Sequence, residues 1–402
     1  MSVRRHWLRF TTAILMLIPC AWVAGQPPER PRDEQPYLTR EELTKKYDQD
    51  GNGELSPGER RTMVQDIIEG RVNVPPPVRE NFRKMAAGAK LRTDQRAEKP
   101  AKSPPGQLVG GRIPDSVTIE QDVVYGDAGG RPLKLDLVLP KEKSEKPRPL
   151  IVFIHGGGWR SGDKAGGVGR VVPFVATGNY VGASVGYRLS GEAIWPAQIH
   201  DCKAAIRWLK ANAAKYQIDP ERIGVWGSSA GGHLVNMLGT TGDVKELEGD
   251  CGSPGISSRV HCVVPFCGPA NFLAPKRFEG GRSPSAVDLL LGGKIEDKQD
   301  LAKQASPITH VSKDDPPFLI VHGTADNTVP FQQAEMFHEA LTKAGVDVTL
   351  VKVLGGSHAI GGDEVLQRVR DFFEKHLRGQ DVKVSDEPIE AGESRVKARG
   401  GE

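Results

Sequence analysis

From Ser116 onward, short apolar runs alternate with longer stretches in which apolar residues recur every three or four positions. Runs such as LIVFIHG and FLIVHG are apolar almost throughout, which is typical of strands covered on both faces of a parallel sheet. The predicted strands are 118–125, 133–139, 150–155, 180–187, 223–226, 260–266, 318–322 and 348–353. The predicted helices are 167–177, 199–216, 230–239, 331–344 and 362–376. This alternation predicts an α/β fold, with helices flanking a mostly parallel sheet.

The start of the chain has a different pattern. Three arginines precede an apolar run over residues 10–23, an order that is typical of a signal peptide. The run is shorter than the ~20 residues that a membrane-spanning helix needs. We therefore expect residues 1–25 to be removed on export to the periplasm or the medium, with no stable membrane span. The sequence LIPC at 17–20 resembles a lipobox, so lipoprotein anchoring is the less favoured alternative, because Pro19 replaces a small flexible residue.

Charge excludes one class of partner. The chain carries 54 Lys and Arg against 51 Asp and Glu, a formal net charge of +3 on 402 residues. That excess is too small for a groove that binds nucleic acid, so we expect no nucleic-acid partner. The length leaves room for one large domain and smaller additions.

The clearest chemical signal is the sequence GSSAG at 227–231, which fits the pattern G-x-S-x-G between a predicted strand and a predicted helix. Ser229 holds the central position. In this motif the serine lies on a tight turn from strand to helix, and side chains two residues away on either side would collide with that turn. The N-terminus of the following helix favours negative charge at the reacting oxygen. We therefore predict that Ser229 is a catalytic nucleophile.

The sequence HGGGW at 155–159 directly follows a predicted strand. A glycine-rich loop allows backbone N–H groups to approach a substrate oxygen closely. We assign the predicted oxyanion hole to the amides of Gly157, Gly158 and Ala230. His155 is interpreted as a residue that fixes the loop, not as a base.

Asp326 and His358 each follow a later predicted strand, on a turn and on a loop. Together with Ser229 they give the chain order Ser, Asp, His, which α/β-hydrolases share. In such a triad the histidine takes the serine proton and returns it to the leaving alcohol, while the aspartate fixes the tautomer of the imidazole. The rival histidines, His322 and His338, are interpreted as structural because one ends a strand and the other lies within a helix.

With HGGGWRSGDK and GSSAG, the chain resembles the α/β-hydrolase superfamily over about 117–378, and within it the esterases that carry an HGGGW loop. Residues 187–249 resemble bacterial secreted acetylxylan and feruloyl esterases. The resemblance implies a serine carboxylic-ester hydrolase without a catalytic cofactor. It also implies small-molecule or polysaccharide esters as substrates, with acetyl or feruloyl groups of plant polysaccharide as the expected acyl groups. Residues 265–272, PFCGPANF, lack carboxylates that such relatives tend to carry, so we expect a different acyl pocket.

Two tryptophans and four cysteines leave alternatives open. Trp159 and Trp195 either line the substrate pocket, offering an aromatic face to a sugar or a phenolic acid, or pack in the interior. The cysteines beyond the predicted signal peptide are Cys202, Cys251, Cys262 and Cys267. In an exported protein a disulfide is possible, with Cys251 as its expected member, whereas reduced cysteines in a core strand are the alternative.

Other functions are compatible with parts of the pattern. A peptidase of the prolyl-oligopeptidase kind has the same triad in the same order, but such enzymes usually add a large propeller for which this chain has no room. A lipase for long acyl chains is less favoured because no long apolar lid segment stands out in the sequence. A calcium-dependent binding or scaffold protein with a hydrolase fold is the alternative from another class, and an intact triad argues against it.

The sequence DQDGNGELSPGE at 48–59 fits the twelve-residue calcium loop of an EF-hand, with Gly53 at the sharp turn. The expected ligands are Asp48, Asp50, Asn52, Glu54, Ser56 and Glu59. Thr39 and Glu42 form a predicted capping box before the loop, and apolar residues at helical spacing follow it. We therefore predict a helix–loop–helix that binds Ca²⁺, with a structural role because a Ser–His–Asp mechanism needs no metal.

These patterns divide the chain into five predicted parts. They are a signal peptide at 1–25, an EF-hand module at 37–70, a basic Pro-rich linker at 71–114, an α/β-hydrolase catalytic domain at 115–378 and a disordered tail at 379–402. The linker and the tail are predicted from their polar composition, which buries too little apolar surface to offset the entropy of ordering.

Overall fold

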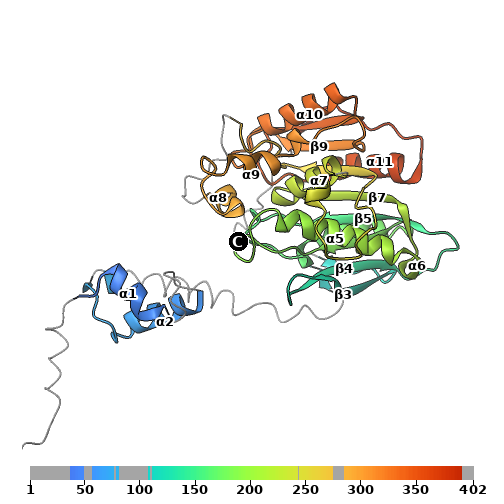
Figure 1. Ribbon diagram of the computed structural model, residues 1–402. Helices are drawn as coiled ribbons and strands as arrows, with labels where there is room; N and C mark the ends of the chain where they lie inside the picture. The colour runs from blue at the N-terminus through green and yellow to red at the C-terminus, as the bar shows by residue number, and fades with distance from the viewer. Residues whose placement is uncertain are drawn as a thin grey trace, which may run out of the picture. The chain divides into compact units, whose positions relative to one another are not determined.

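The computed structural model describes residues 37–48, 57–76, 78–80, 107–108, 111–242, 244–274 and 285–391. The chain divides into two compact units, Met1–Lys102 and Ser103–Glu402, which are treated separately below (Figure 1). The predicted signal peptide lies outside the described residues. In the part that is described, no helix has both the length and the apolar character needed to cross a lipid bilayer.

The first unit contains two helices, α1 (Arg40–Tyr47) and α2 (Pro57–Ile68). The predicted capping box is present at the start of α1: the Glu42 amide donates to Thr39 Oγ1 over 3.3 Å, and the Thr39 amide donates to the Glu42 carboxylate over 2.7 Å. A hydrogen bond of 2.7 Å from the Tyr47 hydroxyl to the Asp66 carboxylate ties the two helices together. The two helices therefore flank the segment where the calcium loop is predicted.

The predicted linker, 71–114, begins too early. Val72 and Val74 are buried and pack in the apolar cluster of the helical unit. The amide of Leu38 donates to the carbonyl of Asn73 over 3.0 Å, which fastens this segment to the residue before the α1 cap. Two valines in a polar stretch are a weak signal in the sequence, but they are enough to join the segment to a small core.

The second unit is built on a sheet whose nine described strands run in the order β11-β10-β9-β8-β7-β5-β6-β4-β3. The strands are β3 (Val117–Asp127), β4 (Pro132–Pro140), β5 (Arg148–Ile154), β6 (Val181–Val185), β7 (Ile218–Ser228), β8 (Cys262–Phe266), β9 (Phe318–Gly323), β10 (Val348–Leu354) and β11 (Ile389–Glu390). Strands β3, β4 and β6 pair antiparallel, and the other neighbours pair parallel. The predicted mostly parallel sheet is confirmed.

Helices cover both faces of this sheet. They are α4 (Ala165–Val175), α5 (Ala197–Ala211), α6 (Ala213–Tyr216), α7 (Ala230–Thr240), α8 (Ala286–Leu291), α9 (Gln299–Gln304), α10 (Gln332–Ala344) and α11 (Asp363–Arg378). Alternate residues of β5 point to opposite faces: Val152 joins a cluster with α5, α7 and α10, and Ile151 joins a cluster with α4 and α11. Figure 1 shows α5 and α7 on the face toward the viewer. This three-layer arrangement explains the apolar runs in the sequence.

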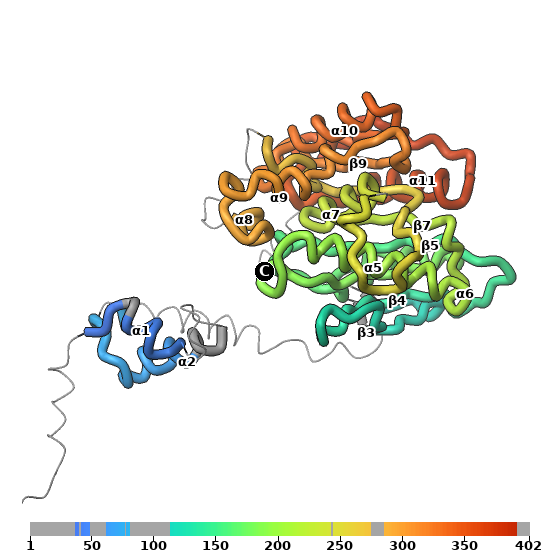
Figure 2. The backbone as a smooth tube through the Cα atoms, in the orientation of Figure 1, coloured from blue at the N-terminus to red at the C-terminus, as the bar shows by residue number. Residues whose placement is uncertain are grey.

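Two short helices, α8 and α9, were not predicted. Each has six residues, which is too short for a helical period to appear in the sequence. In chain order both helices lie between β8 and β9, and Figure 2 shows their backbone in orange. A separate two-stranded pair, β1 (Gln107–Leu108) with β2 (Gly111–Arg112), lies within the predicted linker.

The predicted tail at 379–402 is wrong over its first half. Strand β11 pairs in parallel with the end of β10, with Ile389 opposite Val353. Ile389 is buried in the cluster that α4 and α11 cover. A two-residue strand leaves no period in a polar sequence, so it could not be predicted. Residues 392–402 lie outside the described residues.

Candidate active site

Ser229 lies on the turn between β7 and α7, with φ 57° and ψ −120°. Few residues with a side chain adopt this backbone conformation, and it is found where a site stores strain. A Cβ at Gly227 would lie 2.3 Å from the carbonyl oxygen of Gly231, and a Cβ at Gly231 would lie 2.1 Å from that of Ile154. Only glycine fits at these two positions, as the G-x-S-x-G pattern implies.

The structure brings Ser229, His358 and Asp326 together. His358 Nε2 lies 2.8 Å from Ser229 Oγ, and His358 Nδ1 lies 2.7 Å from Asp326 Oδ2. The three residues follow β7, β9 and β10, so the carboxyl ends of parallel strands gather them at one edge of the sheet. With a proton on Nδ1, the imidazole presents its other nitrogen to the serine hydroxyl. This geometry suits proton transfer from Ser229.

The Asp326 side chain is fully buried, yet its oxygens are well supplied with hydrogen-bond donors. Oδ1 accepts from the amides of Thr328 and Val329 at 2.8 and 2.9 Å. His322 Nε2 lies 3.3 Å from Oδ2, the oxygen that His358 contacts. Burial alone would raise the pKa of Asp326, but hydrogen bonds from both histidines and both amides outweigh burial and hold that pKa well below its usual range. The carboxylate stays ionised.

A second cluster stands around the same carboxylate. Among the described residues, Cys267, His322 and Asp326 form the one group whose metal-binding atoms all lie within 4.8 Å of one another. Burial raises the pKa of the Cys267 thiol far above its usual value, which favours the neutral thiol. His322 Nε2 also lies 2.9 Å from the carbonyl oxygen of Val329. We assign this cluster to the support of Asp326 rather than to a metal.

The glycine loop after β5 lies against the turn that carries Ser229. A Cβ at Gly156 would lie 3.3 Å from the Cβ of Ser229. Gly157 and Gly158 have φ values of 118° and 60°, a backbone path that favours glycine. The loop therefore passes beside the serine, and Ala230 is the first residue of α7. Binding of an oxyanion by these three amides stays a prediction.

His155 is buried behind this loop. Its ring stacks on Tyr187 with 4.3 Å between ring centres, and its Nδ1 lies 2.8 Å from the carbonyl oxygen of Gly156. Burial lowers the pKa of His155. These contacts fit the interpretation of His155 as a residue that fixes the loop. The other rival, His338, lies on α10.

Trp159 and Trp195 pack in the interior. They are 3% and 2% exposed, so neither ring offers a face to a sugar or a phenolic acid. Both rings contact His233, with ring centres 5.2 and 5.6 Å from the imidazole centre. The pocket-lining alternative is therefore wrong for both residues, and the packing alternative is confirmed.

The expected disulfide is not formed. All four described cysteines are free thiols. Cys202, Cys262 and Cys267 are buried as small apolar residues of the core. Cys251 is half-buried, and its thiol donates to the carbonyl oxygen of Asp127 over 2.9 Å. The alternative of reduced cysteines holds in this structure.

The calcium loop lies mostly outside the described residues. Asp48 follows α1, and its amide donates to the carbonyl of Thr44 over 2.9 Å. The predicted ligands outside the described residues are Asp50, Asn52, Glu54 and Ser56. Glu59 belongs to α2, at the position where the second helix of an EF-hand carries its bidentate ligand. The calcium site stays a prediction.

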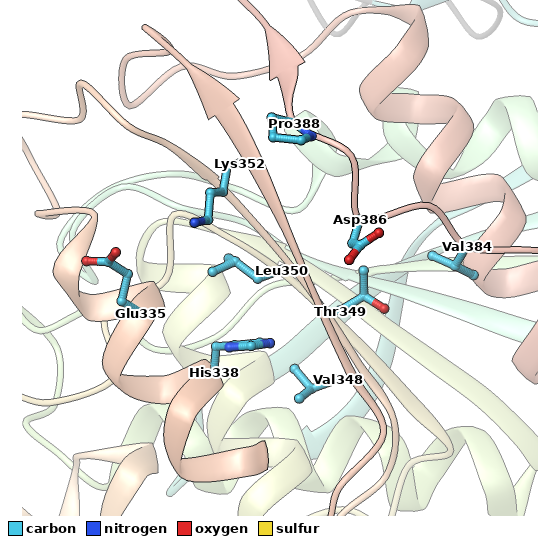
Figure 3. Close-up of a pocket in the computed structure, with 9 residues that line it drawn as sticks. All are labelled: Glu335, His338, Val348, Thr349, Leu350, Lys352, Val384, Asp386 and Pro388. Atoms are coloured by element: carbon cyan, nitrogen blue, oxygen red, sulfur yellow. The ribbon is translucent and has the colours of Figure 1, made fainter. Parts of the chain in front are cut away.

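A pocket of about 640 Å³ lies at the edge of the sheet, between α10, β10 and the segment that leads to β11 (Figure 3). It is lined by Glu335, His338, Val348, Thr349, Leu350, Lys352, Val384, Asp386 and Pro388. No residue of the Ser–His–Asp arrangement lines it. We therefore separate this pocket from the candidate active site.

A strand, a sharp turn with a serine and a helix, followed by an acid after β9 and a histidine after β10, define the α/β-hydrolase class. The chain belongs to the BD-FAE family, whose model matches residues 135–341.

Relatives of this chain include proteins that are named as esterases. The chain is similar to a probable carboxylic ester hydrolase, LipM, of Mycobacterium tuberculosis, with 33% identity over 245 residues, 59% of this chain and 55% of that protein. It is also similar to esterase LipC of the same organism, with 32% identity over 220 residues, 54% of each chain. The chain thus spans about half the length of the curated relatives it matches.

Solved structures similar to this chain are also esterases. A truncated carbohydrate esterase from gut microbiota has a TM-score of 0.58 and 35% identity, covering 64% of this chain and 95% of that chain. A butyrate-bound esterase of the Planctomycetes species Thermogutta terrifontis has a TM-score of 0.53 and 28% identity, covering 65% of this chain and 94% of that chain. These likenesses confirm the predicted α/β-hydrolase fold and the carboxylic ester hydrolase class of the second unit.

Proposed function

We propose that the whole protein is an exported serine esterase that hydrolyses short-chain or phenolic acyl esters through an acyl-enzyme. One observation carries this proposal: the His358 imidazole bridges Ser229 Oγ and Asp326 Oδ2 at 2.8 and 2.7 Å. Nucleophile, base and orienting acid are thus already in hydrogen-bond contact.

In the proposed reaction Ser229 Oγ attacks the ester carbonyl carbon while its proton passes to His358 Nε2. The carbonyl oxygen becomes an oxyanion, which accepts hydrogen bonds from the amides of Gly157, Gly158 and Ala230. The intermediate then expels the alcohol, which takes the proton from His358 and leaves an acyl-serine. Water then attacks the acyl carbon while His358 removes its proton. The bond from that carbon to the serine oxygen breaks, the carboxylic acid product leaves, and the proton returns from His358 to Ser229 Oγ.

Asp326 stays negatively charged throughout this cycle. Its low pKa means that it accepts the hydrogen bond from His358 Nδ1 without taking the proton. A fixed negative charge beside the ring stabilises the imidazolium that forms when Ser229 loses its proton. Since the acid is buried, water does not screen this charge strongly.

The proposed acyl groups are acetyl or feruloyl groups of plant polysaccharide. Support comes from the resemblance to acetylxylan and feruloyl esterases and from the structural likeness to a carbohydrate esterase of gut microbiota. Because Trp159 and Trp195 are buried, the proposed recognition of a sugar does not involve stacking on either of them. The basic and apolar start of the chain supports export to the periplasm or the medium, with lipoprotein anchoring as the less favoured form.

We further propose that the first unit binds one Ca²⁺ through Asp48, Asp50, Asn52, Glu54, Ser56 and Glu59, and that this ion is structural. The loop sequence and the helices on either side of it support this site. Ca²⁺ supplies no step of the proposed reaction.

The deciding experiment is labelling with a fluorophosphonate probe, compared between the wild type and Ser229→Ala. We expect the wild type to be labelled and the variant to be neither labelled nor active, because only the serine alkoxide attacks the phosphorus. An unlabelled wild type that binds Ca²⁺ would favour a scaffold protein. Hydrolysis of p-nitrophenyl acetate, a long-chain p-nitrophenyl ester, methyl ferulate, acetylated xylan and an aminoacyl-proline amide then separates the esterase from a lipase or a peptidase.

A further inference from the structure

A buried histidine connects the two halves of the candidate active site. His233 is the fourth residue after Ser229, in the first turns of α7. Its Nδ1 accepts a hydrogen bond of 3.2 Å from the indole N–H of Trp159, the last residue of the HGGGW loop. Its Nε2 lies 2.7 Å from the carbonyl oxygen of Ala305. The imidazole of His233, which belongs to α7, therefore contacts both the HGGGW loop and the segment after α9.

These contacts fix the form of the imidazole. Nδ1 faces a donor, the indole N–H of Trp159, and Nε2 faces an acceptor, the carbonyl of Ala305. Only the neutral tautomer with its proton on Nε2 satisfies both. The ring is wholly buried and lies among aromatic rings, those of Trp159, Trp195 and Phe272. Since none of the three carries a charge, burial lowers the pKa of His233 to about 4 and keeps the ring neutral.

The loop end that His233 holds is in a strained conformation. Trp159 has φ 56°, in the left-handed region that residues with a Cβ rarely adopt. Gly157 and Gly158 before it have positive φ as well, so three successive residues follow an unusual path. The Trp159 carbonyl accepts from the amide of Ser190 over 2.7 Å, which leaves the indole as the second anchor of this residue. Strain of this kind persists only where the surroundings hold it.

We propose that His233 is a positioning residue that latches the glycine loop to the nucleophile helix through the indole of Trp159. This inference rests on the proposed esterase function. In the tetrahedral intermediate one atom, the carbonyl carbon, is bonded to Ser229 Oγ while its oxygen faces the amides of Gly157 and Gly158. The serine belongs to α7 and the amides to the loop after β5, so a bond between these two elements sets the distance between them.

The test compares two tryptophans whose indole N–H groups donate to different acceptors. Trp159→Phe keeps an aromatic ring but removes the N–H that His233 accepts. Trp195→Phe is the matched control: it is equally buried, contacts the same imidazole, and loses an indole hydrogen bond of 2.9 Å to the Gln304 side chain, outside the loop. Turnover of p-nitrophenyl acetate is measured in both, together with inhibition by a trifluoromethyl ketone, which forms a tetrahedral oxyanion on the serine.

For Trp159→Phe we expect kcat to fall by about 10- to 100-fold, because misplacement of oxyanion donors costs up to the roughly 100- to 1000-fold lost on removing one. KM is expected to change by less than about threefold, and the inhibition constant of the ketone to rise in step with the fall in kcat. Trp195→Phe is expected to keep both quantities within about threefold of the wild type. Equal losses of kcat in the two variants, or an unchanged affinity of Trp159→Phe for the ketone, would overturn the proposal that His233 positions the loop.

His233→Gln provides a second route if Trp159→Phe does not fold. Its amide nitrogen reaches the place of Nε2 and keeps a donor for Ala305, but no acceptor remains for Trp159. We expect the same loss of kcat and ketone affinity, and no further loss when both changes are combined, since both remove one bond. If neither variant folds, His233 is a folding element and the proposal fails. If the wild type itself hydrolyses no ester and takes no fluorophosphonate label, the proposed function fails instead.

Discussion

Protonation of His233 is unfavourable in the folded protein. Its pKa falls from an ordinary value of 6.5 to about 4 because the ring is buried. Between these two values the unfolded chain binds a proton that the folded protein does not, so stability falls as pH drops from about 6.5 to about 4 and changes little from this cause below that. The full contribution of His233 is about 3 kcal/mol.

This dependence is measured by urea unfolding at pH 7 and pH 4.5. Other histidines whose pKa values burial lowers, such as the buried His155 and the half-buried His310, act in the same direction. The His233→Gln variant therefore isolates the contribution of His233 to the pH dependence of stability. Between pH 7 and pH 4.5 we expect the variant to lose about 2–3 kcal/mol less free energy of unfolding than the wild type. Identical losses in both proteins would mean that His233 is not held neutral by burial.

The contacts of Asp326 with His358 and His322 predict how strongly different variants should lower kcat. Asp326→Asn removes the charge that holds the His358 tautomer, so we expect kcat to fall by about 10³- to 10⁴-fold. His322→Asn removes one of several donors to the same carboxylate, so we expect a fall of about 2- to 10-fold, the effect of one ordinary hydrogen bond. His338→Asn, at the pocket on the sheet edge, serves as the control and should leave kcat unchanged.

Single residues differ in how readable they are from sequence. Ser229, Asp326 and His358 could be predicted because each lies at a fixed place relative to a strand, and chain order alone relates them. His233 and His322 could not, because their roles depend on contacts across the fold: His233 meets Trp159, which is 74 positions away in the chain. The burial of Trp195 was equally hidden, since an aromatic residue in a loop suits a pocket and a core alike.

At the scale of elements, the turn between β7 and α7 tolerates no side chain at its glycines. Gly231→Ala would place a Cβ 2.1 Å from the carbonyl oxygen of Ile154, and backbone cannot yield as a flexible side chain would. We expect a loss of about 3 kcal/mol or more, together with displacement of Ser229. Urea unfolding with an unchanged slope measures this loss, and turnover reports the displacement.

Gly166→Ala is the matched control for that substitution. Gly166 lies within α4, and a Cβ there meets nothing within 4 Å. In a helix, alanine is favoured over glycine by about 0.5–1 kcal/mol, so this variant should gain stability and retain turnover. A Gly231→Ala protein as stable and as active as Gly166→Ala would contradict the close packing of the turn.

Elements could be predicted where their pattern is long enough to have a period. The buried strands and the longer helices met that condition, and their predicted ranges match the structure to within a few residues at most ends. The predicted helix 199–216 is an exception, because the structure divides it at Asn212 into α5 and α6. Strand β7 is longer than predicted because its first half, IDPERI, is polar and lies before the buried GVW run. The elements missed include α8, α9, β1, β2 and β11, which have six residues or fewer and are too short to show a period.

At the scale of the whole molecule, the two units predict separate responses to calcium. Removing the proposed Ca²⁺ with a chelator should expose the first unit to proteolysis, because the described residues of α1 and α2 share a small buried cluster. Turnover should change by less than about twofold, since the proposed triad lies wholly within the second unit. Glu59→Gln, at the expected bidentate ligand, should abolish the protection by Ca²⁺ and leave turnover as it was.

A collapse of turnover on chelation, without unfolding, would show instead that the ion acts on catalysis.

The division into two units also marks a limit of prediction from the sequence. The boundary was predicted from composition, and it was misplaced where Val72 and Val74 join the helical unit, because two buried side chains weigh little in a composition but much in a small core.

The place of β7 in the sheet determines which parts of the second unit should unfold first. It is the fifth of the nine described strands, so four strands shield it on each side, and Ser229 is attached directly to its end. Amide hydrogens of β7 should therefore exchange with solvent only through the largest opening events, whereas those of β3 and β11 exchange through local fraying. Warming should first loosen the rims of the sheet while hydrolysis continues. The proposed nucleophile, Ser229, should lose its position only when the whole second unit opens.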